Sequence, residues 1–89
     1  MKAFITVIGK DNIGIIHGVT EVLAQNRVNI LDISQTILQD YFTMVMLVDL
    51  SKMEVELERL KELLEEKGSE LGVSIKVQHE DIFNSMHRL

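Results

Sequence analysis

Residues 28–50, with the sequence VNILDISQTILQDYFTMVMLVDL, decide the fold of this chain. They contain two apolar runs, 28–38 and 41–50, and only Gln39 and Asp40 lie between them. Strands this close in sequence pair antiparallel through a tight turn, so the stretch predicts a β-hairpin. The second run has apolar residues at both alternating sets of positions, which indicates a strand that is shielded from water on both faces.

A strand and then a helix are expected before the hairpin. Residues 2–8 again have apolar side chains on both faces, which predicts a strand in the interior of the sheet. Residues 13–26 change to a helical period. The apolar arc of this helix consists of Ile15, Ile16, Val19, Val22 and Leu23. Gly18 lies beside the arc, which indicates either close packing or room for a ligand.

A second helix and a last strand are expected after the hairpin. Ser51 and Glu54 match the S-x-x-E capping box and predict the helix start, and Gly68 is a suitable stop. The buried side of this helix is expected to contain Met53, Leu57, Leu60, Leu63, Leu64 and Leu71. Residues 73–77 alternate as a half-buried strand does, and the tail 80–89 has apolar residues at helical spacing. Those tail residues are Ile82, Phe83, Met86 and Leu89.

The predicted order of elements defines the fold class. It is an α+β fold, the ferredoxin-like βαββαβ sandwich, in which a four-stranded antiparallel sheet carries two helices on one face. A short C-terminal helix follows. The chain 1–89 is expected to form a single domain, with its core in 4–78 and a helical tail in 80–89.

The composition excludes several classes of function. The chain has 89 residues and no cysteine, which removes disulfides and thiolate metal sites. It has no apolar run of about 18 residues, so no segment is expected to cross a membrane. Nine Lys and Arg residues against fourteen Asp and Glu residues, a net charge of -5, argue against a nucleic acid as partner. We therefore expect a cytoplasmic protein that contacts neither nucleic acid nor membrane.

The predicted strands offer more apolar surface than two helices can cover. The face of the sheet opposite the helices should be polar in a monomer, yet both 2–8 and 41–50 are apolar on both faces. Large exposed apolar patches usually mark a partner or a ligand, so a homodimer or higher homo-oligomer is favoured. The alternative is that the tail 80–89 covers this face.

The loop after the first strand discriminates between functions that this fold can carry. Residues 9–14 contain no C-x-x-C pair for a metallochaperone, and Lys10 is their only cation, which disfavours an acylphosphatase-like enzyme. Tyr41 and Phe42 face opposite ways, so they do not form a platform for RNA bases. The loop does suit a small zwitterion, because the helix start after Gly14 attracts a carboxylate and Asp11 attracts an ammonium group. Alternatively, Asp11 only caps the helix.

The stretch GKDNIGIIHGVTEVLAQNRVNILDISQT, residues 9–36, resembles the opening of an ACT domain. The matching motifs are D-x-x-G-[IV] at Asp11, Gly14 and Ile15, and V-N-I at residues 28–30. The segment 32–36, Asp-Ile-Ser-Gln-Thr before a hairpin, is similar to short stand-alone ACT proteins. Ile13 departs from the pattern, because many family members have proline there.

The resemblance implies a regulatory module that binds an amino acid or a similar small molecule. Such domains pair side by side or face to face, and the ligand lies between domains. The residues that the resemblance implies as ligand contacts are Asp11, Asn12, Ile13, Gly14, Ile15, Asn29 and Ile30. The regulated enzyme would then be on a separate chain.

No catalytic residues, metal ligands or cofactor are expected. The spacing of His17, His79 and His87 does not suit a helical metal site, and no Ser–His–Asp set is recognisable. The sequence therefore predicts an amino-acid-binding regulatory homodimer that modulates a partner protein and is not an enzyme. The alternative is a pure dimerisation or protein-interaction module without a small ligand.

Overall fold

Four antiparallel strands form one sheet in the computed structural model, which describes residues 1–86. The strands are β1 (Lys2–Lys10), β2 (Asn29–Leu38), β3 (Tyr41–Asp49) and β4 (Val73–His79). Their order across the sheet is β2-β3-β1-β4, so β1 and β3 are central and β2 and β4 are edges. The expected ferredoxin-like arrangement and the central position of the first strand are confirmed.

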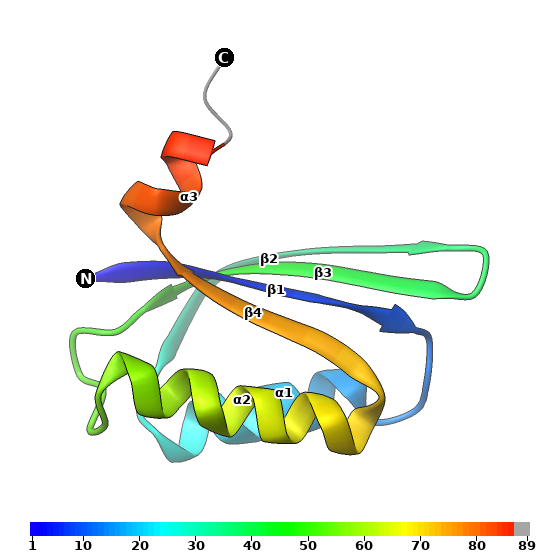
Figure 1. Ribbon diagram of the computed structural model, residues 1–89, viewed down its shortest axis with the longest axis horizontal. Coiled ribbons are helices and arrows are strands. Elements are labelled where there is room, and N and C mark those ends of the chain that lie inside the picture. The colour runs from blue at the N-terminus through cyan, green and yellow to red at the C-terminus, as the bar shows by residue number, and fades with distance from the viewer. Residues whose placement is uncertain (87–89) are drawn as a thin grey trace.

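Three helices complete the fold. They are α1 (Ile15–Gln25), α2 (Leu57–Leu71) and α3 (Glu80–Met86). Helices α1 and α2 cover one face of the sheet, and α3 stands on the opposite side (Figure 1). The tail position Leu89 and the third histidine, His87, lie outside the described residues.

The core lies between the sheet and the two long helices. Ile5 of β1 faces Met46 of β3 on one side and Val77 of β4 on the other, and all three side chains are buried. From the helices, Leu23 and Leu64 are buried against them. Burial of about 25 cal/mol per Å² of apolar surface makes this layer the main source of stability.

Helix α1 differs from its prediction at one apolar position. Ile15, Val19, Val22 and Leu23 are buried as expected, but Ile16 is exposed on the flank of the helix. The arc that reaches the core is therefore narrower than the arc of apolar residues, which leaves Ile16 available at the surface.

The predicted ends of α2 are both wrong. The helix begins at Leu57, with Glu56 as its N-cap and without a side-chain cap. The Ser51 N–H instead donates to Asp49 Oδ1 at 2.9 Å, so Ser51 belongs to the turn that leaves the sheet. At the other end, Gly68 is buried inside the helix, and Gly72, with φ of 74°, is the residue that ends it.

Helix α3 covers only part of the open face. The rings of Phe83 and Phe4 stack with their centroids 4.1 Å apart, which attaches α3 to β1. Ile8, Leu38 and Tyr41 remain exposed. The tail thus covers some of the open sheet, as the alternative interpretation expected, but leaves apolar surface free.

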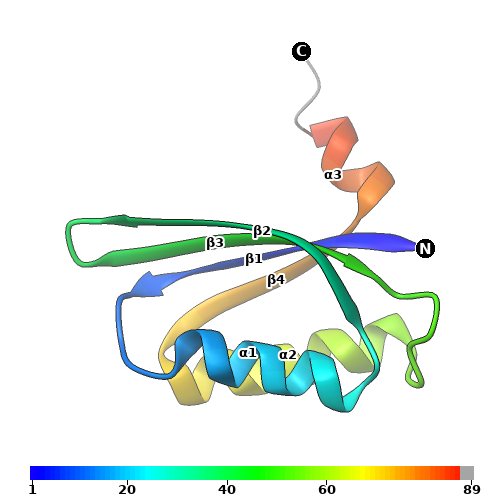
Figure 2. The same cartoon turned by 180° about the vertical axis from the view of Figure 1, so that it is seen from behind.

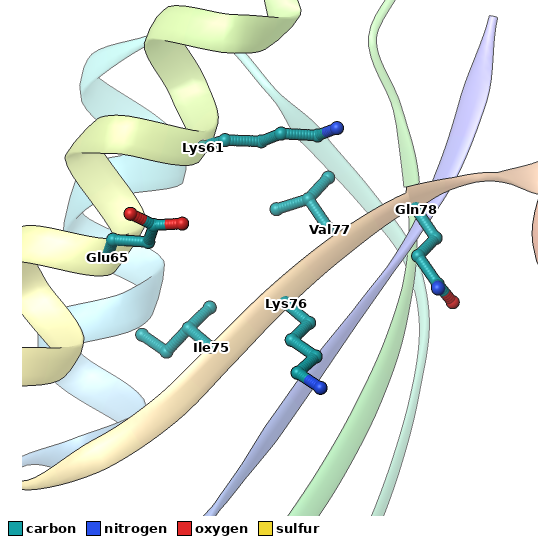
Figure 3. A pocket seen from close by; sticks show the side chains of 6 residues that line it. All are labelled: Lys61, Glu65, Ile75, Lys76, Val77 and Gln78. Atoms are coloured by element: carbon teal, nitrogen blue, oxygen red, sulfur yellow. The ribbon is translucent and has the colours of Figure 1, made fainter.

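The β4 edge borders a groove beneath α2. Lys61 and Glu65 of α2 lie across from Ile75 and Val77, while Lys76 points away from the helix (Figure 3). Ile75 and Val77 are buried, so the side chains exposed to solvent at this edge are mainly charged and polar.

Two helical glycines should respond differently to alanine. A Cβ at Gly68 would lie 2.7 Å from the Val73 carbonyl oxygen, which belongs to the backbone of the sheet and cannot yield. We expect Gly68→Ala to destabilise the fold by about 1–3 kcal/mol in urea unfolding. At Gly18 the nearest atom is the flexible end of Leu71, at 2.8 Å, and alanine gains about 1 kcal/mol of helix propensity. Gly18→Ala should therefore stay within about 1 kcal/mol of the wild type; equal losses at both positions would contradict this account.

Candidate functional site

The loop between β1 and α1 leaves the start of α1 uncapped by any side chain. Gly14 is the N-cap residue and has a left-handed backbone, with φ of 89°. The Gly18 N–H donates to the Gly14 carbonyl at 2.9 Å and closes the first turn. The backbone N–H groups of that turn have no intrahelical acceptor and carry the positive end of the helix dipole. A Cβ at Gly14 would meet nothing within 4 Å, so open space adjoins this helix start.

Two hydrogen bonds shape the loop. Asn12 Oδ1 accepts from the Ile13 N–H at 2.8 Å, and the Asp11 N–H donates to the Asp40 carbonyl at 2.7 Å. The second bond ties the loop to the turn of the β2–β3 hairpin. Asp11 does not cap α1, so the interpretation of Asp11 as a simple cap is wrong. Its carboxylate is free to face a ligand.

Ile13 has an unusual environment for a large apolar side chain. It is 96 % exposed at the outer side of the loop. Ile15, the next apolar residue, is buried in the core. The loop therefore combines an anion-attracting helix start, one carboxylate and one solvent-exposed apolar side chain.

Asn29 and Ile30 lie at the other end of the sheet. At the loop end of the sheet, Lys10 pairs with Tyr41, which in turn pairs with Leu38. At the opposite end, Lys2 pairs with Asp49, which in turn pairs with Asn29. At about 3.3 Å per residue, the ten-residue strand β2 separates the two groups by about 30 Å. Figure 2 shows the hairpin turn and the loop at one end and the start of β2 at the other. One chain does not bring the seven expected contact residues together.

A polar pocket of about 140 Å³ adjoins Asn29 at the start of β2. Its walls are formed by Arg27, Asn29, Asp49, Ser51 and Lys52. The hydrogen bond from the Ser51 backbone holds the pKa of Asp49 below its usual value, so this carboxyl is ionised near neutral pH. Sequence reasoning included Asn29 and missed the other four residues, because they are separated in sequence and share no motif.

Strand β2 is an edge strand with an apolar surface. All but one of its residues are exposed, and Leu31 is the extra residue of an irregularity between Ile30 and Asp32. Ile33 and Ile37 pair with the buried Met46 and Phe42, so they lie on the helix side of the sheet. Their side chains are 45 % and 51 % exposed. An edge of this kind is a template for pairing with another strand.

The described residues offer no metal site. Within residues 1–86, no group of three or more His, Cys, Asp or Glu side chains could hold an ion. His17 instead pairs with Glu21 at 3.1 Å, and His79 Nδ1 accepts from the Asp81 N–H at 3.1 Å. Over the same part of the chain, none of the helices has the length and apolarity to cross a membrane.

Comparison with known proteins gives the class of this fold and loop. A family model described as the ACT domain matches residues 2–78. The chain belongs to the ACT domain family, whose members are regulatory modules that bind small ligands. A small protein of Clostridium acetobutylicum, named as a UPF0237 protein, is 63% identical over 89 residues, and the alignment covers 100% of both chains.

Solved structures agree with this assignment. An ACT domain protein from Streptococcus pneumoniae is 44% identical with a TM-score of 0.81, and 93% of each chain is covered. The ligand-free regulatory subunit of aspartate kinase from Thermus thermophilus is 24% identical with a TM-score of 0.67. That likeness covers 86% of this chain and 50% of the other, and it shows the shared fold alone.

The backbone of Gly14 allows a direct test of the loop. Alanine would fit the space but not the backbone angle, because a left-handed non-glycine residue costs about 1–2 kcal/mol. We expect Gly14→Ala to lose about that much stability in urea unfolding and Gly14→Asn to lose less, because asparagine tolerates this angle. Equal stability of Gly14→Ala and the wild type would show that the loop relaxes to another conformation.

Proposed function

We propose that this ACT domain binds an amino acid between two copies of itself and thereby regulates a partner protein. One observation carries the proposal: the expected contacts form two groups, at the β1–α1 loop and at the start of β2, about 30 Å apart in one chain. In one chain the loop group lacks the contacts expected from Asn29 and Ile30, and these two residues lack the loop. A second copy supplies the missing half.

Pairing through the β2 edge brings the two groups together. A two-fold axis beside β2 makes the two β2 strands antiparallel, so the start of one strand lies at the hairpin end of the other. With the axis at Gln35, Ile33 of each copy faces Ile37 of the other, on the helix side of the joined sheet. Asn29 of the second copy then extends past the hairpin turn, toward the loop that is hydrogen-bonded to Asp40.

Pairing through the β4 edge would not bring the two groups together. Pairing through β4 leaves β2 at the outer limit of the joined sheet, so Asn29 of one copy stays far from the other copy's loop. The β4 edge also presents mainly charged and polar groups, whereas β2 presents isoleucines. Burial of apolar surface therefore favours the β2 edge.

The roles of the site residues follow from their chemistry. The backbone N–H groups that follow Gly14 hold the ligand carboxylate, and Asp11 holds its ammonium group. The side-chain amide of Asn29 can donate to the first and accept from the second. Asn12 shapes the loop, while Ile13 and Ile30 supply apolar contact.

Regulation would operate through linkage between ligand and assembly. A ligand that contacts both copies binds the dimer better than the monomer and shifts the population toward the dimer. A partner protein that recognises one of these states is then controlled by the ligand concentration. The proposed action is binding, without a chemical reaction on the ligand.

A ligand screen tests the small-molecule part of the proposal. At about one hundred times its dissociation constant, a bound amino acid adds about 2.7 kcal/mol of stability, or about 10 °C or more in Tm for a chain of this size. We expect such a rise with one or a few of the common amino acids for the wild type but not for Gly14→Ala. Gly72→Ala is the matched control, because it carries a similar backbone strain outside the loop, at the end of α2, and should keep the response. No response to any amino acid would favour the interaction module without a ligand.

A pair of lysine substitutions tests the geometry of the dimer. Ile33→Lys places a charge on the β2 edge and should convert the dimer to a monomer in sedimentation analysis. Ile8→Lys makes the same change on the open face of the sheet, where the isoleucine is similarly exposed, at 49 %, and it should leave the dimer intact. The reverse pattern would indicate that the copies pair face to face through the open side of the sheet.

A further inference from the structure

We propose that the ligand carries a second carboxylate, as in an acidic amino acid, which the pocket formed by Arg27 and Lys52 holds. The inference rests on the proposed function and specifies the class of its ligand. The pocket also contains Asn29, the residue expected to contact the zwitterionic part of the ligand. A side chain that extends from that part therefore meets Arg27 and Lys52 first.

Several basic groups lie around this pocket. The chain has a net charge of -5, yet this end of the sheet gathers Arg27, Lys52, Lys2 and the N-terminal amine. Asp49 is the acidic group in the pocket wall. The charges of Lys2 and the N-terminus act on Asp49, and its carboxylate accepts from the Ser51 N–H. Asp49 thus has a hydrogen-bond partner of its own, and no ion pair joins it to Arg27 or Lys52.

Neither pocket cation is committed to a strong partner. Arg27 Nη1 lies 3.5 Å from Glu54 Oε1, and both side chains are more than 60 % exposed, at 61 % and 64 %. A pair of this length and exposure contributes little and can be exchanged for a ligand carboxylate. Lys52 forms no ion pair with any of the described residues. Arginine and lysine together can hold a carboxylate from two directions.

The backbone of Arg27 is a second, independent indication. The Arg27 N–H donates to the Ala24 carbonyl at 3.2 Å, and the Val28 N–H donates to the Leu23 carbonyl at 2.9 Å. These two bonds form the Schellman motif that ends α1, and its left-handed residue is usually glycine. Here it is arginine, with φ of 59°. A strained position occupied by a long cation points to a role for the side chain.

The size of the pocket agrees with a short second group. A cavity of about 150 Å³ holds a molecule of the size of benzene. The pocket of about 140 Å³ therefore accepts the carboxylate end of an aspartate or glutamate, while the rest of the ligand reaches the loop of the second copy.

Pairs of isosteric ligands test this inference. The wild type is titrated by calorimetry with L-aspartate and L-asparagine, and with L-glutamate and L-glutamine. We expect one acid to bind at least tenfold more tightly than its own amide, because a charge-assisted contact replaces a neutral one. Equal or tighter binding of the amides, or of another neutral amino acid, would overturn the inference and leave the proposed function intact. No binding of any amino acid would overturn both.

Substitutions of Arg27 and Lys52 test whether these two residues cause the preference for the acid over its amide. Lys52→Gln removes one charge, and Arg27→Asn removes the other with a residue that suits the left-handed backbone and keeps the end of α1. Each should reduce the ratio of acid to amide affinity by about tenfold. Lys76→Gln, on the opposite edge of the sheet, removes the same unit of charge and should keep the ratio. Retention of the full ratio in both pocket variants would overturn the assignment.

Discussion

The pairing of β1 on both of its sides is the constraint on which the rest of the structure depends. The same strand faces β3 over its whole length and β4 over most of it, and its alternate side chains Ala3, Ile5 and Val7 are fully buried. Because β1 is central, β2 and β4 must be edges, and both long helices must cross the same face. The position of the β1–α1 loop beside the hairpin turn follows directly, because β1 and β3 run in opposite directions.

That antiparallel register also explains why the residues of the proposed site fall into two groups. The loop at Gly14 follows the end of β1, and Asn29 begins β2, so the sheet itself keeps them apart. In the proposed site, recognition would depend on assembly, because the loop and Asn29 would meet only across two copies. The exposed isoleucines of β2 offer apolar area that the proposed assembly would bury. In this proposal, the edge strand that would join two copies also begins with Asn29, one of the expected contact residues.

The spacing of apolar residues predicted the strands, the helices and their buried faces. Every second residue of a half-buried strand faces the core, and every third to fourth residue of a surface helix does so. The prediction was wrong at the ends of α2, where Ser51 turns the chain toward Asp49 and Gly68 packs against β4. These outcomes depend on which element lies opposite, and a local pattern does not contain that information. The pocket beside Asn29 was missed for the same reason: Arg27 and Lys52 become neighbours only after the sheet has formed.

The pairing of β1 with β4 also has a consequence during synthesis on the ribosome. The β2–β3 hairpin involves neighbouring residues and can form as soon as it emerges, and β1 can join β3 soon afterwards. The other side of β1 stays unpaired until residues 73–79 have left the exit tunnel. Until then the growing chain exposes a hydrogen-bonding edge and the uncovered side of Val7 and Ile5. Unpaired strand edges and exposed apolar surface are prone to aggregation, so addition of the last strand removes this hazard from the growing chain.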